Sequence, residues 1–205
     1  MNDLIISIIT VLIAYLIGSI PTGIILGKVY NKTDIRKHGS GSTGATNIAR
    51  TLGIKAGIIV LIIDILKGAI GVGLSIVISG NEWISAISGI FVITGHIIPV
   101  FAKLKGGKGV ATAIGAITII YPLGLIGVLI GILTILFTRL VSLGSIIGSI
   151  ATVVIVLISF IFIKNGSSIW DLIFFIIAAI IILISHHENI VRLINGKENK
   201  ISIKK

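Results

Sequence analysis

Three polar segments rich in glycine, in hydroxyl or amide side chains and in positive charge interrupt a strongly apolar chain. They are residues 34–50, 103–109 and 186–192. Backbone N–H groups on glycine turns, flanked by Lys or Arg, form a suitable site for a phosphate group. Three such segments at the ends of apolar runs indicate an enzyme that handles phosphorylated molecules at a bilayer surface.

The first segment combines glycines, which permit tight turns with exposed N–H groups, with side chains that donate hydrogen bonds to phosphate. The glycines are Gly39, Gly41 and Gly44, and the donors are Ser40, Ser42, Thr46, Asn47 and Arg50. The spacing formally matches G-x-G-x-x-G, but a dinucleotide site needs a preceding buried strand, and a charged loop precedes it here. We therefore predict a phosphate site. The alternative is a flexible loop with turn chemistry.

The second segment contains Lys105-Gly106-Gly107-Lys108-Gly109, which resembles half of a P-loop. The residue after Lys108 is not the Ser or Thr that would bind magnesium, so nucleotide hydrolysis is not indicated. A glycine turn that opens a helix at Val110 still makes an anion site, because the positive end of the helix faces the ligand. The alternative is a set of ordinary lysines at the cytoplasmic end of a span.

The third segment places His186 and Asn189 three residues apart, so they share a face if the last helix continues through them. Arg192 extends that stripe. A histidine with a pKa near neutrality can transfer a proton or donate to a phosphate. Metal binding is not indicated, because no carboxylate or histidine cluster with ligand spacing accompanies it.

Three further polar residues lie inside apolar runs. Asp64 and Lys67, at positions i and i+3, predict a mutual ion pair, because an unpaired charge at that depth is costly. We predict that His96 packs between helices with its ring hydrogen-bonded, near a kink at Pro99. The chain lacks the His-x-x-x-x-Asp signature of soluble-type glycerolipid acyltransferases and any Gly-x-Ser-x-Gly elbow.

Composition restricts the class of protein. Of 205 residues, 55% are hydrophobic and 12% are charged, and the mean hydropathy is +1.18. A soluble domain of this length could not bury so much aliphatic surface, so we expect an integral membrane protein without a soluble domain. The absence of Cys excludes disulfides, thiolate metal sites and a cysteine nucleophile. The net charge of +10 lies in short clusters without interleaved aromatics, which argues against nucleic acid binding.

Most apolar runs have the roughly 20 residues that cross a hydrocarbon core about 30 Å thick. They fall at about Leu4–Leu26, Ala56–Ser79, Ile84–Ala102, Val110–Thr138, Val141–Ile163 and Ile169–Ser185. The first run follows an acidic start and has no small-residue cleavage site, so we interpret it as a retained span and not as a signal peptide.

The run Val110–Thr138 decides the topology. As one helix it would be roughly 43 Å long, too long without a steep tilt. Pro122 disfavours helix at Tyr121, and a turn there gives seven helices. With seven, all three polar segments and the basic clusters share the cytoplasmic face, as the positive-inside rule requires. With six, the third polar segment would lie outside.

We therefore predict an all-α integral membrane protein, a seven-transmembrane-helix bundle with its N-terminus outside and its C-terminus cytoplasmic. Short or broken helices are expected around Val110–Pro122, where the first half is too short to cross unaided. Residues 1–195 form a single transmembrane domain, and residues 196–205 form a polar, basic, loosely ordered tail.

In these features the chain resembles the bacterial acyl-phosphate:glycerol-3-phosphate acyltransferases (the PlsY family). The resemblance extends over about the whole chain. It departs from the family pattern at Ser42, where Asn is commoner, at Leu104, often Phe, and at Ser185, often Arg. The matching residues are Gly39-Ser40-Gly41-Ser42, Gly44-Ala45-Thr46-Asn47 and Arg50; Asp64 and Lys67-Gly68; Gly95-His96, Pro99, Phe101 and Lys105-Gly106-Gly107-Lys108-Gly109-Val110-Ala111-Thr112; and His186, Asn189, Ile190, Arg192, Leu193, Gly196 and Glu198.

This resemblance implies transfer of a fatty acyl chain from acyl phosphate to the 1-hydroxyl of glycerol 3-phosphate, giving lysophosphatidic acid and phosphate in the first step of phospholipid synthesis. It implies no acyl-CoA, metal or other cofactor. It places the enzyme in the bacterial inner membrane with a cytoplasmic active site, coupled functionally to the soluble enzyme that makes acyl phosphate from acyl-carrier protein.

On these grounds we predict a set of catalytic residues and a set of substrate-binding or phosphate-binding residues that converge on one pocket. The catalytic set is Ser40, Arg50, Lys108, His186 and Asn189; the binding set is Gly39, Gly41, Ser42, Thr46, Asn47, Lys105, Gly106 and Gly107.

Two other functions fit parts of the sequence. An organophosphate transporter would also use basic residues and glycine breaks, but near mid-membrane and often in two related halves. The polar segments here lie at one face, and no duplication is evident. A scaffold that binds anionic lipids would tolerate any arrangement of Lys and Arg.

Overall fold

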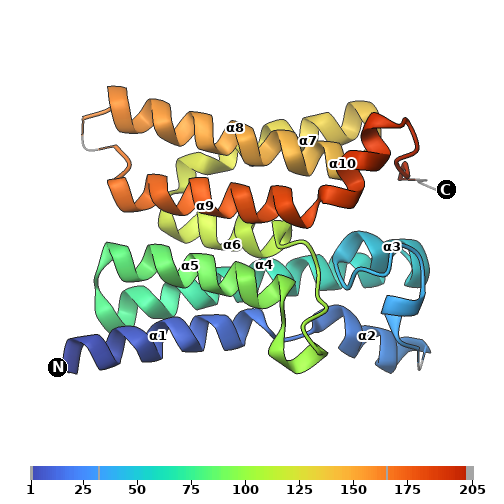
Figure 1. Cartoon of the computed structure of the whole chain (residues 1–205), viewed down its shortest axis with the longest axis horizontal. Coiled ribbons are helices and arrows are strands. Elements are labelled where there is room, and N and C mark those ends of the chain that lie inside the picture. The colour runs from blue at the N-terminus through green and yellow to red at the C-terminus, as the bar shows by residue number, and fades with distance from the viewer. Residues whose placement is uncertain (1, 32, 165, 202–205) are drawn as a thin grey trace. The chain divides into compact units, whose positions relative to one another are not determined.

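The computed structural model describes residues 2–31, 33–164 and 166–201. The chain divides into two compact units, Met1–Ile120 and Tyr121–Lys205 (Figure 1). The described residues form helices and connecting loops without any strand, in agreement with the predicted all-α class.

In the described part of the first unit, the chain forms six α-helices and two short 3-10 turns. Helix α4 packs against α1, α3, α5 and α6, so it is the central element of this unit. The helices are α1 (Asn2–Gly18), α2 (Thr22–Asn31), α3 (Ala45–Leu52), α4 (Ile54–Ser79), α5 (Glu82–Ile97) and α6 (Val110–Ile120), and the turns are η1 (Ile35–Lys37) and η2 (Val100–Ala102).

Glycines let α4 and α6 approach each other closely. A Cβ on Gly68 of α4 would collide with the carbonyl of Thr112, and one on Gly115 of α6 would collide with the carbonyl of Ile65. Small residues at such crossings are the usual means of packing helices in a membrane, where lipid is as apolar as the side chains. The short helix α6 is thereby held against a helix of 26 residues.

The first apolar run contains a break that the sequence analysis does not anticipate. Helix α1 ends at Gly18, and α2 begins at Thr22 directly after Pro21. Proline can occupy this place because it lacks an N–H and needs no partner within the helix. In this break the Ile20 carbonyl accepts a hydrogen bond from Lys67 of α4 at 3.2 Å.

Helix α5 ends just before its proline, at the place where the sequence analysis predicts a kink. Its last residue is Ile97, and the chain turns at Ile98 and Pro99 into a loop that leads to α6. The Tyr15 hydroxyl of α1 donates to the Ile98 carbonyl at 2.9 Å. The loop therefore starts from a fixed point.

Residues 121–164 and 166–201 of the second unit form four α-helices and one 3-10 turn. Helices α7 and α8 pair through Gly131 and Gly144, since a Cβ on Gly131 would lie 2.6 Å from the Gly144 carbonyl. Each helix carries two glycines four positions apart, Gly127 and Gly131 on α7 and Gly144 and Gly148 on α8, a pattern typical of close helix packing in membranes. The elements are η3 (Pro122–Gly124), α7 (Leu125–Thr138), α8 (Val141–Phe162), α9 (Ile169–Ser185) and α10 (His187–Ile194).

The predicted turn near Pro122 is confirmed. Helix α6 ends at Ile120, Tyr121 is extended with φ −153° and ψ 94°, and α7 begins at Leu125. The residue before a proline avoids the helical region because of a clash with the proline ring. By contrast, the last helix does not continue through the third polar segment, because α9 and α10 are bent by 63°.

Within the described ranges, four helical segments are long and apolar enough to cross a membrane. The α9–α10 pair is a fifth if counted as one span, and α6 and α7 are shorter apolar helices. The coarse prediction of a multi-helix membrane protein therefore agrees with the structure. The four segments are Asp3–Tyr30, Ile54–Ser79, Glu82–Ala102 and Val141–Phe162.

Candidate active site

The first two polar segments meet at one end of the first unit. Thr43 N–H donates to the Gly106 carbonyl at 3.4 Å, and Nη1 of Arg36 donates to the Ala102 carbonyl at 2.9 Å. Residues about 60 positions apart in the chain are thus hydrogen-bonded to each other. Part of the predicted convergence, that between residues 34–50 and 103–109, is present within this unit.

Asn47 holds the first segment in shape. Its buried Nδ2 donates to the carbonyls of His38 at 3.1 Å and Ser42 at 2.8 Å, and lies 3.4 Å from that of Ile35. Its Oδ1 accepts from Ser40 N–H at 2.9 Å. The predicted role of Asn47 is phosphate contact, but the amide is fully committed to the loop backbone, so its observed task is to fix where Ser40 and Ser42 lie.

Most of the glycine-turn amides in this segment bind within the protein. Gly39 and Gly41 have φ of +60° and +71°, which glycine adopts without strain. The N–H groups of Ser40, Gly41, Thr43 and Gly44 donate to Asn47, His38, Gly106 and Ser42, respectively. The expectation that the turns present open amides is therefore wrong at these four positions. The contribution of the segment to a ligand must come from side chains and from the start of α3.

Ser40 and Arg50, predicted to be catalytic, are exposed, and Thr46 is half-buried in the first turn of α3. Gly44, the N-cap of that helix, makes no side-chain cap. The N–H groups of the first turn of a helix need partners from outside the helix, and an anion can supply them.

Asp34 and Arg36 neutralise each other beside this site. Arg36 donates to both carboxylate oxygens of Asp34, with an Nη2–Oδ2 distance of 2.7 Å. Hydrogen bonds from Arg36 lower the pKa of Asp34 to about 2, and the same pairing raises the pKa of Arg36. Because the pKa of Asp34 is depressed, the pair stays ionised until the pH falls towards that value. Arg36 is therefore a structural cation.

The second segment is fixed from behind by the end of α5. Gly106 N–H donates to the Ile97 carbonyl and Gly107 N–H to the His96 carbonyl, each at 3.1 Å. These two amides thus face the protein and not a ligand, contrary to the prediction. The half-buried Lys108 lies two residues before the first residue of α6, and Lys105 is exposed. Anion binding by the lysines of this segment and by the first turn of α6 stays a prediction.

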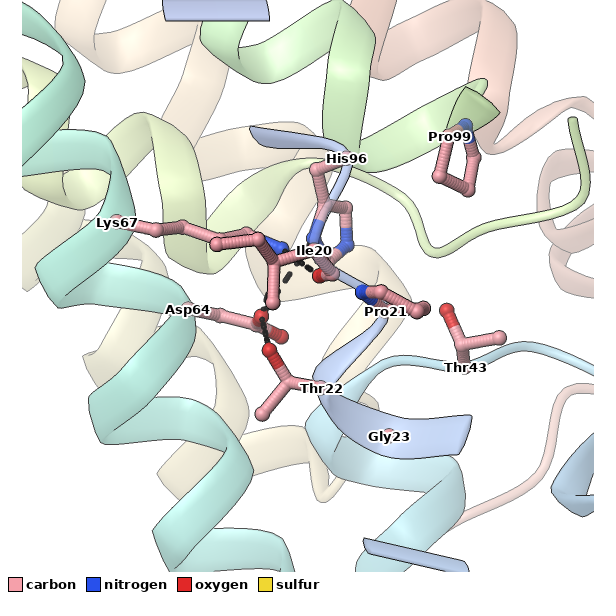
Figure 2. Close-up of a pocket in the computed structure, with 9 residues that line it drawn as sticks. All are labelled: Ile20, Pro21, Thr22, Gly23, Thr43, Asp64, Lys67, His96 and Pro99. Carbon is pink, nitrogen blue, oxygen red and sulfur yellow. Dashed lines mark hydrogen bonds and ion pairs between the residues drawn. The ribbon is translucent and has the colours of Figure 1, made fainter. Parts of the chain in front are cut away.

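A small pocket lies beneath the two segments (Figure 2). At its centre Asp64 accepts from Lys67 Nζ at 2.9 Å and from Thr22 Oγ1 at 3.1 Å, and Lys67 also donates to the Ile20 carbonyl at 3.2 Å. The predicted Asp64–Lys67 ion pair is confirmed. The pocket is lined by Ile20, Pro21, Thr22, Gly23, Thr43, Asp64, Lys67, His96 and Pro99.

His96 differs from its prediction. It is buried as expected, but its Nδ1 has no hydrogen-bond partner among the described residues and lies 3.7 Å from Oδ1 of Asp64. Its ring faces Gly107, because a Cβ on Gly107 would overlap Nε2 of His96 and lie 2.9 Å from Cε1. The histidine therefore separates the buried ion pair from the glycine turn.

The third segment organises the second unit around Glu198. Glu198 accepts from Asn189 Nδ2 and from Arg192 Nε, both at 2.8 Å. Desolvation raises the pKa of Glu198, but the hydrogen bonds from Arg192 and Asn189 outweigh it, so the pKa is lowered. The tail is held in place at this residue, and the prediction that it is loosely ordered is wrong there.

His186 lies at the bend between α9 and α10 and is 3% exposed. Its Nδ1 is 2.8 Å from the Ile182 carbonyl, which can only accept, so Nδ1 carries a proton. In the neutral imidazole the lone pair is then on Nε2. The convergence of this segment with the first two stays a prediction.

Sequence reasoning missed the break at residues 19–23 as part of the site. Thr22 binds Asp64, and a Cβ on Gly23 would collide with the Thr43 carbonyl, so the start of α2 lies directly against the first segment. The signal was present in the sequence Ser19-Ile20-Pro21-Thr22-Gly23, which places proline, glycine and two hydroxyl residues within five positions of an otherwise aliphatic run. The sequence analysis also did not single out Thr43, because this residue contributes through its backbone N–H and carbonyl, which no sequence pattern marks.

The family profile described as "Glycerol-3-phosphate acyltransferase" matches residues 8–196. "Glycerol-3-phosphate acyltransferase 2" of Bacillus anthracis is 48% identical over 196 residues, which is 95% of this chain and 99% of that relative. A crystal structure of PlsY (YgiH), an integral membrane glycerol 3-phosphate acyltransferase, in its glycerol 3-phosphate form, superposes with a TM-score of 0.86 at 35% identity, covering 96% of each chain.

The lysophosphatidic acid form of the same protein gives a TM-score of 0.83 at 35% identity, covering 96% of this chain and 95% of that one. The matches in sequence and in structure thus extend over nearly the whole length of both partners. They agree with the meeting of two basic, glycine-rich segments at one end of a helical unit. The chain belongs to the glycerol-3-phosphate acyltransferase family.

Proposed function

We propose that this acyltransferase moves a fatty acyl group from acyl phosphate to the sn-1 hydroxyl of glycerol 3-phosphate, giving lysophosphatidic acid and inorganic phosphate. The observation that carries the proposal is the direct hydrogen bond between the two basic segments, Thr43 N–H to the Gly106 carbonyl. The solved relative in its glycerol 3-phosphate and lysophosphatidic acid forms supports the acceptor and the product.

Both substrates of this reaction carry a phosphate, so the site must hold two anionic groups close together. Arg50 and Lys108 offset their repulsion, and a guanidinium offers two parallel hydrogen bonds to one phosphate. Ser40, Ser42 and Thr46 donate from the first segment, with Lys105 at the rim. Arg36 is not available for this task because Asp34 neutralises it.

The remaining predicted residues shape the two segments. Gly39 and Gly41 provide the positive φ values of the first loop, and Asn47 ties that loop together. Gly106 and Gly107 let the second loop lie directly on the end of α5. A rigid arrangement of this kind lowers the barrier by aligning the reactants before reaction.

The chemistry needs positioning more than a strong nucleophile, because acyl phosphate is an activated mixed anhydride. The acceptor hydroxyl oxygen attacks the acyl carbonyl carbon, and the bond from that carbon to the phosphate oxygen breaks. The hydroxyl proton leaves on the departing phosphate, whose developing charge Arg50 and Lys108 stabilise. No acyl-enzyme forms in this scheme, and an acyl adduct trapped on Ser40 would contradict it.

In this proposal His186 and Asn189 orient the acceptor. With its Nδ1 proton held by the Ile182 carbonyl, His186 presents an unprotonated Nε2 when neutral. It can therefore take the hydroxyl proton if the departing phosphate does not. Asn189 is held by Glu198 and so has a fixed side-chain direction.

Seven membrane-crossing helices complete the proposal, with the N-terminus outside, the C-terminus and active site cytoplasmic, and residues 1–195 as one domain of a bacterial inner-membrane protein. Helix α6, at 11 residues, is too short to cross alone. Its burial against α4 supports its place inside the bilayer, since short helices are tolerated there when other helices surround them. The acyl phosphate is supplied by the soluble enzyme that draws on acyl-carrier protein.

The test is to purify the protein in detergent and supply glycerol 3-phosphate with either acyl phosphate or acyl-CoA. We expect lysophosphatidic acid and inorganic phosphate in equal amounts from acyl phosphate, and no product from acyl-CoA. Product formed from acyl-CoA at a comparable rate would refute the donor, and the absence of product from both would refute the reaction.

Replacing Gly107 by alanine should raise the KM for glycerol 3-phosphate about tenfold, because overpacking of a tight site costs about 1–3 kcal/mol. The added Cβ would overlap the buried ring of His96, so either the ring or the glycine turn must move. The matched control is Gly73→Ala in α4, where a Cβ would meet nothing within 4 Å. Steady-state kinetics check both variants; equal KM values would contradict the expectation.

A further inference from the structure

The partners of the buried Asp64–Lys67 ion pair are groups of the protein. Asp64 and Lys67 have side chains that are 2% and 5% exposed. They bind each other, the Thr22 hydroxyl and the Ile20 carbonyl (Figure 2). The pair therefore joins the middle of α4 to the break between α1 and α2. Buried charges are retained where a fixed geometry is required, since burying them gives little net stability.

His96 lies between this pair and the glycine turn. On one side its Nδ1 is 3.7 Å from Oδ1 of Asp64. On the other side its ring abuts Gly107, so closely that no Cβ fits there. Two backbone hydrogen bonds hold the turn against the end of α5. Gly106 N–H donates to the Ile97 carbonyl, and Gly107 N–H donates to the carbonyl of His96 itself.

The position of the His96 ring affects both residues 103–109 and residues 34–50. Lys108 follows Gly107 directly, so a shift of the turn moves the lysine to which the proposed function assigns phosphate binding. The Gly106 carbonyl accepts from Thr43 N–H, so the same shift reaches the first segment. The approach to this turn is itself unusual, because Lys103 and Leu104 have φ of 55° and 59°. Few non-glycine residues take that conformation unless their surroundings impose it.

We propose that His96 is a positioning residue for glycerol 3-phosphate binding: held over the Asp64–Lys67 ion pair, its ring is the surface against which the Lys105–Gly109 turn is set. It touches no reacting atom. This inference rests on the proposed function and adds a residue to its binding machinery. A purely structural histidine would affect stability alone, whereas a positioning residue alters substrate affinity in an otherwise folded enzyme.

The test compares His96→Ala with Val92→Ala in membranes prepared from expressing cells, where folding does not depend on detergent. Val92 is on the same helix and is also fully buried, but it packs on the α4 residue Gly71 and not on the turn. We expect His96→Ala to raise the KM for glycerol 3-phosphate about 10-fold to 100-fold. The KM for acyl phosphate should change much less, and Val92→Ala should leave both values near wild type.

A milder variant, His96→Gln, keeps a polar group under the turn and should give an intermediate KM. It also decides the outcome if His96→Ala does not insert. An unchanged KM in the His96 variants, or an equal rise in Val92→Ala, would overturn the inference. Failure of the wild-type protein to form lysophosphatidic acid would instead overturn the proposed function, so the two failures are distinct.

Discussion

Replacing Arg50 or Lys108 by alanine should lower the rate of acyl transfer by about 10²–10³-fold, the usual cost of losing one donor to a developing oxyanion. Each removes a cation from a site that holds two phosphates. Arg50 is in the last turn of α3 and Lys108 lies two residues before α6, so they belong to the two segments that the Thr43–Gly106 hydrogen bond joins. Release of phosphate from acyl phosphate in the presence of glycerol 3-phosphate measures the rate.

The matched control is Lys55→Ala, which removes an exposed cation five positions from Arg50 at the start of α4. It should retain near wild-type activity, because Lys55 belongs to neither segment. Arg50→Lys should fall between wild type and Arg50→Ala, since it keeps the charge but loses the planar fork. Equal loss in Lys55→Ala and Arg50→Ala would show that net charge near the membrane matters, and not a phosphate site.

The second large effect is expected for Asn47→Asp, a change of one atom type at constant shape. The new carboxylate oxygen would face the carbonyls of Ile35, His38 and Ser42, all acceptors, where Nδ2 of Asn47 now donates. Each buried acceptor left without its donor costs about 1–3 kcal/mol, so the loop should rearrange. Since Ser40 and Ser42 are positioned by that loop, we expect acyl transfer to fall about 100-fold.

Activity and thermal unfolding of Asn47→Asp should be measured beside Asn81→Asp. Asn81 is the exposed N-cap of α5, where Asp is as good a residue as Asn. The control should therefore match wild type in both measurements. Retained activity in Asn47→Asp would show that the loop does not depend on this side chain.

Those parts of the fold that depend on length, hydropathy and local spacing could be predicted from the sequence. The turn at Tyr121–Pro122 follows from a run too long for one span and from the steric effect of proline. The Asp64–Lys67 pair follows from i,i+3 spacing in an apolar helix, where neither charge is stable alone. In each case the deciding residues are close together in the chain.

The parts that escaped prediction depend on the path of the backbone through loops. Asn47 looked like a ligand donor because its side chain can donate, yet its partners are carbonyls up to 12 residues away that only the folded loop brings together. Gly106 and Gly107 looked like open amides for the same reason. The bend at His186 has neither proline nor glycine to announce it, since the sequence there is Ser-His-His-Glu.

The contacts of Glu198 bear on how the polypeptide is engineered. Asn189 and Arg192 share its carboxylate, and Ile201 N–H donates to the Arg139 carbonyl at 2.9 Å. The polar segment around Glu198 thus anchors α10, the helix that carries Asn189. Truncation ahead of position 198 would leave an amide and a guanidinium without their shared anion, whereas a purification tag fused after the final residue would preserve it.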